Sequence, residues 1–132
     1  MIDKFETKVY WQDTDAYGVV WHGNYLRWFE KARTQFCEKL GYKLEEYEAR
    51  GIVSPVVGIN IKYKKSAKLH EKITIETKLI AVKRFMMSFE QVVKNGDEIY
   101  TIAQIDVVFV DVNTGKMLRK LPMENVEQYI ES

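Results

Sequence analysis

The apolar residues of this chain change period once, from the spacing of a helix to the spacing of strands. From residue 24 to about residue 39 they recur at three- and four-residue steps, at Tyr25, Trp28, Phe29, Ala32, Phe36 and Leu40. This spacing places them on one face of a helix, and Gly41 supplies a stop signal. Leu26 and Cys37 add apolar surface beside that face. We therefore expect a central helix that is covered over more than half of its circumference.

After the helix the period becomes two, which is typical of half-buried strands. Apolar and polar residues alternate over residues 59–64, 73–81 and 101–109. Asn95-Gly96 separates residues 89–93 from residues 99–102 and predicts a hairpin, because both residue types tolerate a positive φ. These patterns predict four strands that follow the helix.

Further signals complete the architecture. Lys83-Arg84 and residues 113–115 are expected to be turns, and Pro122 suits the first turn of a short C-terminal helix that carries Val126, Tyr129 and Ile130. One more strand is expected near residues 7–11. The sequence thus predicts an α+β domain in which an antiparallel sheet of about five strands wraps around one long helix.

Composition narrows the class of protein. A chain of 132 residues that is 46% hydrophobic suits one domain, residues 1–132. Lys plus Arg total 20 against 19 Asp plus Glu, which argues against a nucleic-acid-binding surface. The apolar runs are too short for membrane insertion. We expect a cytoplasmic protein, because the N-terminus resembles no signal peptide and Cys37 has no second cysteine to pair with.

The segment before the long helix carries the residues that suit catalysis. Two carboxylates, Asp13 and Asp15, one of only two histidines, His22, and the glycines Gly18 and Gly23 precede or begin the helix. A helix N-terminus presents unpaired N–H groups and the positive end of the helix dipole, which stabilise developing negative charge. The pattern predicts an oxyanion site with an acid or base beside it.

Residues 10–33, with the sequence YWQDTDAYGVVWHGNYLRWFEKAR, resemble the hotdog-fold thioesterases of the 4-hydroxybenzoyl-CoA type. They are most similar to the branch of acyl-CoA thioesterases associated with the Tol-Pal envelope system, and the likeness extends more loosely to Leu121-Pro122. The resemblance implies a hotdog fold and hydrolysis of acyl-CoA to a carboxylic acid and free CoA. It assigns the catalytic aspartate to Asp15 and a catalytic histidine to His22. The backbone N–H that polarises the thioester carbonyl falls at His22 or Gly23.

Thioester chemistry agrees with this assignment. The departing thiolate needs little protonation, so a nucleophile and an oxyanion site suffice. Asp15 would either attack the carbonyl or deprotonate a water molecule, and the sequence leaves both routes open. Structural alternatives are an Asx turn at Asp15 and, for His22, a helix cap or a ring packed beneath Trp21. Asp13 is expected to tie the loop to backbone donors.

Further residues are expected to contact the substrate. Tyr17, Val20 and Asn24 lie in the same segment, although Asn24 also suits a cap or a loop brace. The cations Lys62, Lys65, Lys83 and Arg84 are candidates for the CoA phosphates, with a solvated charged face as the alternative.

The sequence does not indicate a thiol nucleophile or a metal site. Cys37 has no activating neighbour, and His70 suits a solvated turn. We expect no metal or cofactor.

Two other functions share this fold class, a hydratase or dehydratase and a non-catalytic module that binds acyl-CoA or acyl-carrier protein. Release of thiol from acyl-CoA would distinguish hydrolysis from both. Unpaired sheet edges and an open catalytic loop predict a homodimer at minimum, paired edge to edge with sites shared between protomers. The resemblance implies the same arrangement, with a tetramer left open.

Overall fold

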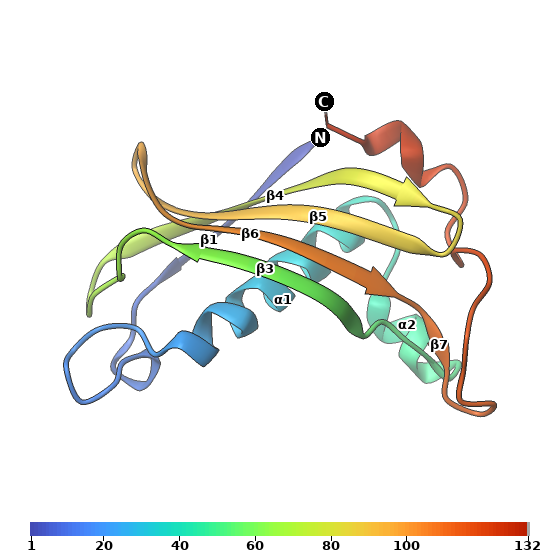
Figure 1. Ribbon diagram of the computed structural model, residues 1–132, viewed down its shortest axis with the longest axis horizontal. Helices are drawn as coiled ribbons and strands as arrows, with labels where there is room; N and C mark the ends of the chain where they lie inside the picture. Colours follow the sequence, from blue (N-terminus) through green and yellow to red (C-terminus); the bar gives the residue numbers. More distant parts are fainter. Residues whose placement is uncertain (132) are drawn as a thin grey trace.

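The computed structural model describes residues 1–131. A five-stranded antiparallel sheet arches over one long helix, α1, in the strand order β1-β4-β5-β6-β3 (Figure 1). The bounds are β1 Ile2–Lys8, α1 His22–Lys39, β3 Val56–Tyr63, β4 Lys72–Lys83, β5 Met86–Asn95 and β6 Glu98–Val108. This architecture confirms the predicted α+β class and the five strands around one helix.

Helix α1 buries the predicted apolar face. It begins at His22, two residues earlier than expected, and its buried residues are Asn24, Tyr25, Trp28, Phe29, Ala32, Phe36 and Cys37. The helix packs against β1 and β4, and the Phe36 ring meets Phe89 of β5 edge to face at 5.6 Å. Each such side chain contributes about 1.5–3 kcal/mol on burial. The expectation for Leu26 was wrong, because this side chain is 45% exposed.

Within residues 1–131, no helix combines the length and the apolarity needed to cross a membrane.

The predicted hairpin is present between β5 and β6. Asn95 pairs with Glu98, so Gly96 and Asp97 form a two-residue loop. Gly96 has a φ of 60° at the first loop position, which matches a type II′ turn and favours glycine there. The β4–β5 turn and the turn at residues 112–115 also lie where the sequence places them.

The two ends of the chain differ from the prediction. The first strand is β1, Ile2–Lys8, and residues 11–13 form a short 3-10 helix instead of continuing it. The chain turns there because the Asp13 carboxylate accepts the Tyr10 N–H. Near the C-terminus a 3-10 helix, η2, spans Val126–Tyr129 and begins after Pro122. Asn125 has a φ of 58°, a left-handed conformation that a right-handed helix cannot include. The helix therefore begins after Asn125 and not at Pro122.

Four short elements were not predicted. They are α2 (Leu44–Ala49), β2 (Ile52–Val53), β7 (Val110–Asp111) and β8 (Lys116–Met117). Strands β2, β7 and β8 form a small separate sheet. Elements of two to six residues are too short to produce a recognisable hydrophobic period.

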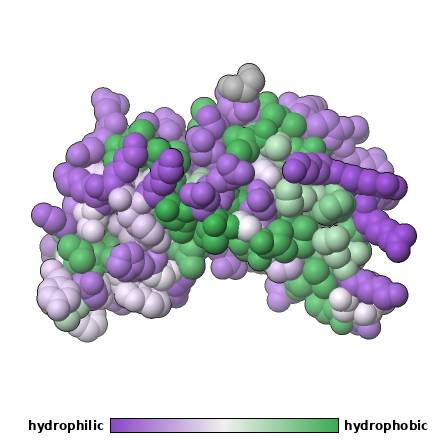
Figure 2. Space-filling model, viewed as in Figure 1, coloured by the Kyte–Doolittle hydropathy of each residue, from purple (hydrophilic) through white to green (hydrophobic). Residues whose placement is uncertain are grey.

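Strand β3 departs most from the expectation of a half-buried strand. Ile59 is 48% exposed and Tyr63 is 47% exposed, because β3 is the last strand of the sheet and has a neighbour on one side only. Val56 and Val57 are exposed as well. Figure 2 shows hydrophobic surface along this region, above the hollow between the two ends of the molecule.

The two edges of the sheet have different chemistry. Strand β1 carries four charged residues, Asp3, Lys4, Glu6 and Lys8. The part of β4 beyond β1 is covered by the C-terminal segment, where the Glu131 N–H donates to the Leu79 carbonyl at 2.8 Å. Strand β3 carries only Lys62 as a charged residue. Charged and covered edges resist pairing with another chain, so β3 is the edge that is open to it.

Candidate functional site

The loop of residues 13–21 leads from the segment after β1 into the N-terminus of α1. Hydrogen bonds between its own backbone groups hold its two ends together. The Asp15 N–H donates to the Val19 carbonyl at 2.9 Å, and the Trp21 N–H donates to the Asp13 carbonyl at 3.0 Å. The Val20 N–H donates to the Ala67 carbonyl at 2.9 Å. The loop is therefore docked on the segment between β3 and β4.

Asp13 and Asn24 brace this loop. Asp13 Oδ2 accepts the Tyr10 N–H at 2.9 Å, and Oδ1 accepts the Asn24 side-chain amide at 3.1 Å. Asn24 is only 4% exposed. Asp13 thus ties the loop to a backbone donor as expected, and the Asn24 amide serves as a brace.

Asp15 lies on the exposed side of the loop. Its Oδ1 accepts the Tyr17 N–H at 2.8 Å, which forms an Asx turn. Its Oδ2 accepts no hydrogen bond from residues 1–131. The Asx turn therefore orients the carboxylate and leaves one oxygen available to a water molecule or a substrate.

The first turn of α1 presents free backbone donors. Trp21, the N-cap residue, is extended and makes no side-chain cap bond, and the N–H groups of His22 and Gly23 have no acceptor in the described part of the chain. A Cβ on Gly23 would lie 2.3 Å from the Trp21 ring, so glycine lets that ring lie against the first turn. Two backbone N–H groups without an acceptor at a helix N-terminus can donate hydrogen bonds to an anion or to a developing negative charge.

His22 is exposed and belongs to a row of aromatic rings. It meets Tyr63 of β3 edge to face at 5.3 Å, and Tyr63 meets Tyr25 at 5.5 Å. The N-cap residue of α1 is Trp21 and not His22. The imidazole is thus positioned by β3, at the same end of the molecule as Asp15.

Glu71 stabilises residues 67–71, the segment that contacts the loop of residues 13–21. The sequence did not indicate this role of Glu71. Glu71 Oε2 accepts the Tyr100 hydroxyl at 2.5 Å and the Asn95 amide at 2.7 Å, and Oε1 accepts the Lys68 N–H at 3.0 Å. Burial alone would raise the pKa of Glu71, but these hydrogen bonds lower it below its ordinary value. The bond to Glu71 raises the pKa of Tyr100.

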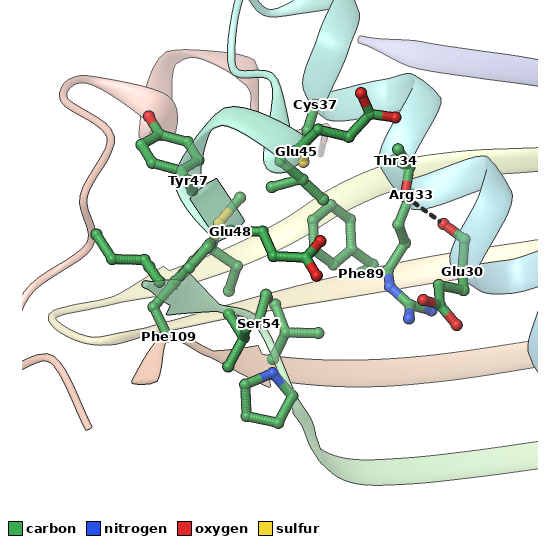
Figure 3. Close-up of a pocket in the computed structure, with 16 residues that line it drawn as sticks. Glu30, Arg33, Thr34, Cys37, Glu45, Tyr47, Glu48, Ser54, Phe89 and Phe109 are labelled. Atoms are coloured by element: carbon green, nitrogen blue, oxygen red, sulfur yellow. Dashed lines mark hydrogen bonds between the residues drawn. The ribbon is translucent and has the colours of Figure 1, made fainter. Parts of the chain in front are cut away.

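A cleft of about 480 Å³ lies between α1, α2 and the sheet, and we call it the α1–α2 cleft (Figure 3). Its lining comprises Glu30, Arg33, Thr34, Cys37, Leu44, Glu45, Tyr47, Glu48, Ile52, Val53, Ser54, Pro55, Met87, Phe89, Val107 and Phe109. Arg33 lies eleven residues after His22 on α1, which is about 16 Å along the helix. Within one chain, the cleft and the Asp15 loop are therefore apart.

Cys37 faces this cleft and is not activated. It is 4% exposed, and burial raises the pKa of its thiol to about 12. A protonated thiol is a poor nucleophile.

The other residues expected at the site are scattered. Tyr17 is 89% exposed, whereas Val20 is buried in the core and offers no surface to a substrate. Lys62 is exposed on β3. Lys65 pairs with Glu98 at 3.0 Å.

Lys83 and Arg84 line a second cleft of about 460 Å³, the C-terminal cleft, together with Val82, Lys120, Leu121, Pro122, Met123, Glu124 and Glu127. Within residues 1–131, none of its three cations is in an ion pair. The C-terminal cleft lies at the end of β4 away from the Asp15 loop.

Comparisons with known proteins agree with this architecture. Residues 9–128 match the family described as the thioesterase-like superfamily. The acyl-CoA thioesterase YbgC of Haemophilus influenzae is 36% identical over 117 residues, 86% of this chain and 82% of that protein. The protein YneP of Bacillus subtilis is 41% identical over 76 residues, 58% of this chain and 55% of that protein.

A solved structure is also similar. The DHNA-CoA thioesterase of Staphylococcus aureus superposes with a TM-score of 0.85 at 32% identity, and the match covers 89% of this chain and 80% of that chain. The chain belongs to the thioesterase-like superfamily. This confirms the family expected from residues 10–33, and the YbgC relatives fit the expected branch.

Replacing Glu71 with Gln should destabilise the fold at neutral pH. The pKa of Glu71 is lower in the folded state than in the unfolded state. The ionised carboxylate therefore stabilises the fold above the unfolded pKa, and this contribution is lost as the pH falls through the folded pKa. We expect a loss of about 1–2 kcal/mol at neutral pH and a smaller loss at about pH 3. Urea unfolding followed by tryptophan fluorescence measures both values.

The matched control is Glu98→Gln, which removes the exposed partner of Lys65 and should change stability little. An equal loss for Glu71→Gln at both pH values would contradict the assigned role of the ionised carboxylate.

Proposed function

We propose that this member of the thioesterase-like superfamily hydrolyses acyl-CoA thioesters to a carboxylic acid and free CoA. The observation that carries the proposal is that Asp15 lies in the closed loop that leads directly into α1. Within residues 1–131 one of its carboxylate oxygens accepts no hydrogen bond, and the N–H groups of His22 and Gly23 in the first turn of α1 have no acceptor. The names of the relatives YbgC and DHNA-CoA thioesterase support the substrate class.

The N-terminus of α1 supplies the electrostatic part of the reaction. An N–H of His22 or Gly23 donates to the thioester carbonyl oxygen and stabilises the negative charge that forms there in the tetrahedral intermediate. Since no side chain caps these donors, binding the carbonyl displaces only solvent.

Asp15 supplies the attack, directly or through water. In one route its carboxylate adds to the carbonyl carbon and forms an anhydride, which water then hydrolyses; in the other it removes a proton from the attacking water. In both routes the carbon–sulfur bond breaks and the electron pair leaves with the thiolate, which takes up a proton. His22 lies at the same end of the helix and assists the proton transfer.

The active unit is a dimer that pairs through β3. This strand has an open, largely uncharged edge, and its apolar side chains are half exposed in the single chain. Pairing two copies across a two-fold axis satisfies the unpaired backbone groups of both edges and covers Ile59 and Val57.

Such pairing completes the catalytic site. Antiparallel alignment of the whole strand sets Val56 of one protomer opposite the partner's Tyr63. Tyr63 contacts His22 within its own chain, and Val56 follows Ser54 and Pro55, which line the α1–α2 cleft. Each cleft thus opens toward the partner's His22 and Asp15 and holds the acyl group of a thioester attacked there.

The C-terminal cleft is the better candidate for the CoA phosphates. Its three cations, Lys83, Arg84 and Lys120, outnumber the two carboxylates of its lining, Glu124 and Glu127. Within residues 1–131 none of these cations is in an ion pair, whereas Lys65 is already paired with Glu98. Unpaired cations bind phosphate without first breaking an ion pair.

Asp15→Asn should lower kcat by about a hundredfold or more with little change in melting temperature. His22→Gln should cost less, about tenfold. Release of thiol from acyl-CoA, followed with a thiol reagent, measures both. The control is Asp97→Asn, in the exposed β5–β6 turn, which should retain full activity. Retention of more than about a tenth of the rate by Asp15→Asn would contradict the proposal.

Ile59→Glu should convert the dimer to monomers, because it introduces one carboxylate in each protomer and places the two like charges near each other at the two-fold axis. We expect sedimentation equilibrium to give the 15.6 kDa mass and activity to fall at least about tenfold. Lys4→Glu on β1 is the matched control and should remain dimeric and active. A wild-type protein that is active at the monomer mass would overturn the shared site.

Lys83→Ala/Arg84→Ala should raise KM for acyl-CoA about tenfold, because charge-assisted bonds to phosphate are lost. Hydrolysis of an S-acyl-N-acetylcysteamine, which lacks the nucleotide phosphates, should be unchanged. The comparison variant is Lys62→Ala/Lys65→Ala. A larger rise in KM for that variant would place the phosphates at the other end of the sheet.

A further inference from the structure

The hydroxyl of Tyr25 is a buried polar group that the reaction described above does not use. Tyr25 is the fourth residue of α1 and is 2% exposed. Its Oη accepts the N–H of Ala67 at 3.1 Å, and Ala67 is fully buried. Burying a hydroxyl costs free energy unless it is hydrogen bonded. A phenylalanine would fill the same space in the core but would leave the buried Ala67 N–H without an acceptor.

Ala67 connects Tyr25 to the Asp15 loop. Its carbonyl accepts the Val20 N–H at 2.9 Å, so Ala67 bonds the helix through its N–H and the loop through its C=O. Val20 follows Val19, whose carbonyl accepts the Asp15 N–H at 2.9 Å. Two hydrogen bonds therefore join the Tyr25 side chain to the residues that hold Asp15, and we call them the Tyr25–Ala67–Val20 link.

This link is one of two that fix the Asp15 loop to the start of α1. The other is the Asp13 carboxylate, which accepts the Asn24 amide at 3.1 Å. The two anchor points on the loop, Asp13 and Val20, lie on either side of Asp15 in the sequence. The position of the Asp15 carboxylate relative to the N–H groups of the first turn therefore depends on both links.

Residues 64–71 are held to the sheet without the help of Tyr25. The N–H groups of Lys64 and Lys65 donate to the Tyr100 carbonyl at 2.8 Å and 3.0 Å, and Glu71 accepts the Tyr100 hydroxyl. Loss of the Tyr25 hydroxyl therefore leaves this segment attached to β6 and removes only its hydrogen bond to α1. The Asp15 loop can then shift relative to the helix while the fold persists.

We propose that Tyr25 is a positioning residue for thioester hydrolysis. Through the Tyr25–Ala67–Val20 link, its hydroxyl holds the attacking carboxylate of Asp15 in place relative to the N–H groups of the first turn of α1. The inference rests on the proposed function. A nucleophile and the donors of an oxyanion site must be held to within about 0.5 Å of the productive geometry, and a displacement of about 1 Å can cost about a hundredfold in rate.

Tyr25→Phe should lower kcat about tenfold and change KM less than about twofold, because the clefts that bind the substrate are untouched. Thiol release is measured with whichever of butyryl-CoA, hexanoyl-CoA and benzoyl-CoA the wild-type protein hydrolyses fastest. The matched control is Tyr42→Phe, which removes a hydroxyl beyond the other end of α1, where it donates to the Glu124 carbonyl at 2.8 Å. The control should retain the wild-type kcat. A wild-type kcat for folded Tyr25→Phe overturns the inference.

A double-mutant cycle separates positioning from a loss of folded protein. In the Asp15→Asn background, Tyr25→Phe should lower the remaining rate less than about twofold, since no attacking carboxylate is left to position. A structural defect would instead multiply with the loss of Asp15. A tenfold loss in both backgrounds therefore contradicts a positioning role.

A second variant removes the same hydrogen bond from its other partner. Replacing Ala67 with lactic acid turns the peptide bond before it into an ester that has no N–H, and kcat should again fall about tenfold. If Tyr25→Phe does not fold, an unchanged kcat in this ester variant overturns the inference. Failure of the wild-type protein to release thiol from all three substrates would instead overturn the proposed hydrolysis, and the inference with it.

Discussion

The burial of α1 beneath the sheet determines where the other functional parts lie. Phe29 and Phe36 are fully buried, and the far end of the helix is fixed by the buried Asp3, which accepts bonds from Gln35 and Lys39. With its axis set, the helix must begin at the end of the sheet where residues 13–21 meet residues 67–71. The Asp13 brace then closes the loop, and the uncapped first turn keeps its N–H groups for an external oxygen.

The sequence predicted those features whose determinants are local. The period of the apolar residues gave the long helix, the later strands and the hairpin, because each period depends on neighbours a few residues apart. Asp15, His22 and Gly23 were proposed as site residues because they lie close together in the sequence, before or at the start of the helix. Contacts between distant residues were missed. Arg33 and Gln91 are 58 residues apart, and Tyr100 and Glu71 are 29 apart, so only the packing of α1 on the sheet and the order of the strands bring them together.

The exposed edge at β3 shows a second limit of sequence patterns. Alternation of Ile59 and Ile61 with polar neighbours indicates which face of a strand is apolar, but it does not indicate whether anything in the same chain covers that face. In this protein the helix covers the other strands and leaves β3 half exposed. The same uncovered strand carries Tyr63, which positions His22, and it begins beside the cleft. The account therefore links association of protomers to completion of the site.

Complementation between two inactive variants tests this link most directly. Asp15→Asn removes the attacking carboxylate, and Glu48→Trp fills the cleft, so each homodimer should be inactive. In a mixed dimer with shared sites, one site has an intact Asp15 from one chain and an intact cleft from the other. Unfolding and refolding the two variants together should restore about a quarter of the wild-type rate, since half of the dimers are mixed and each has one working site. No recovery, with mixed dimers shown to form, would contradict the shared site.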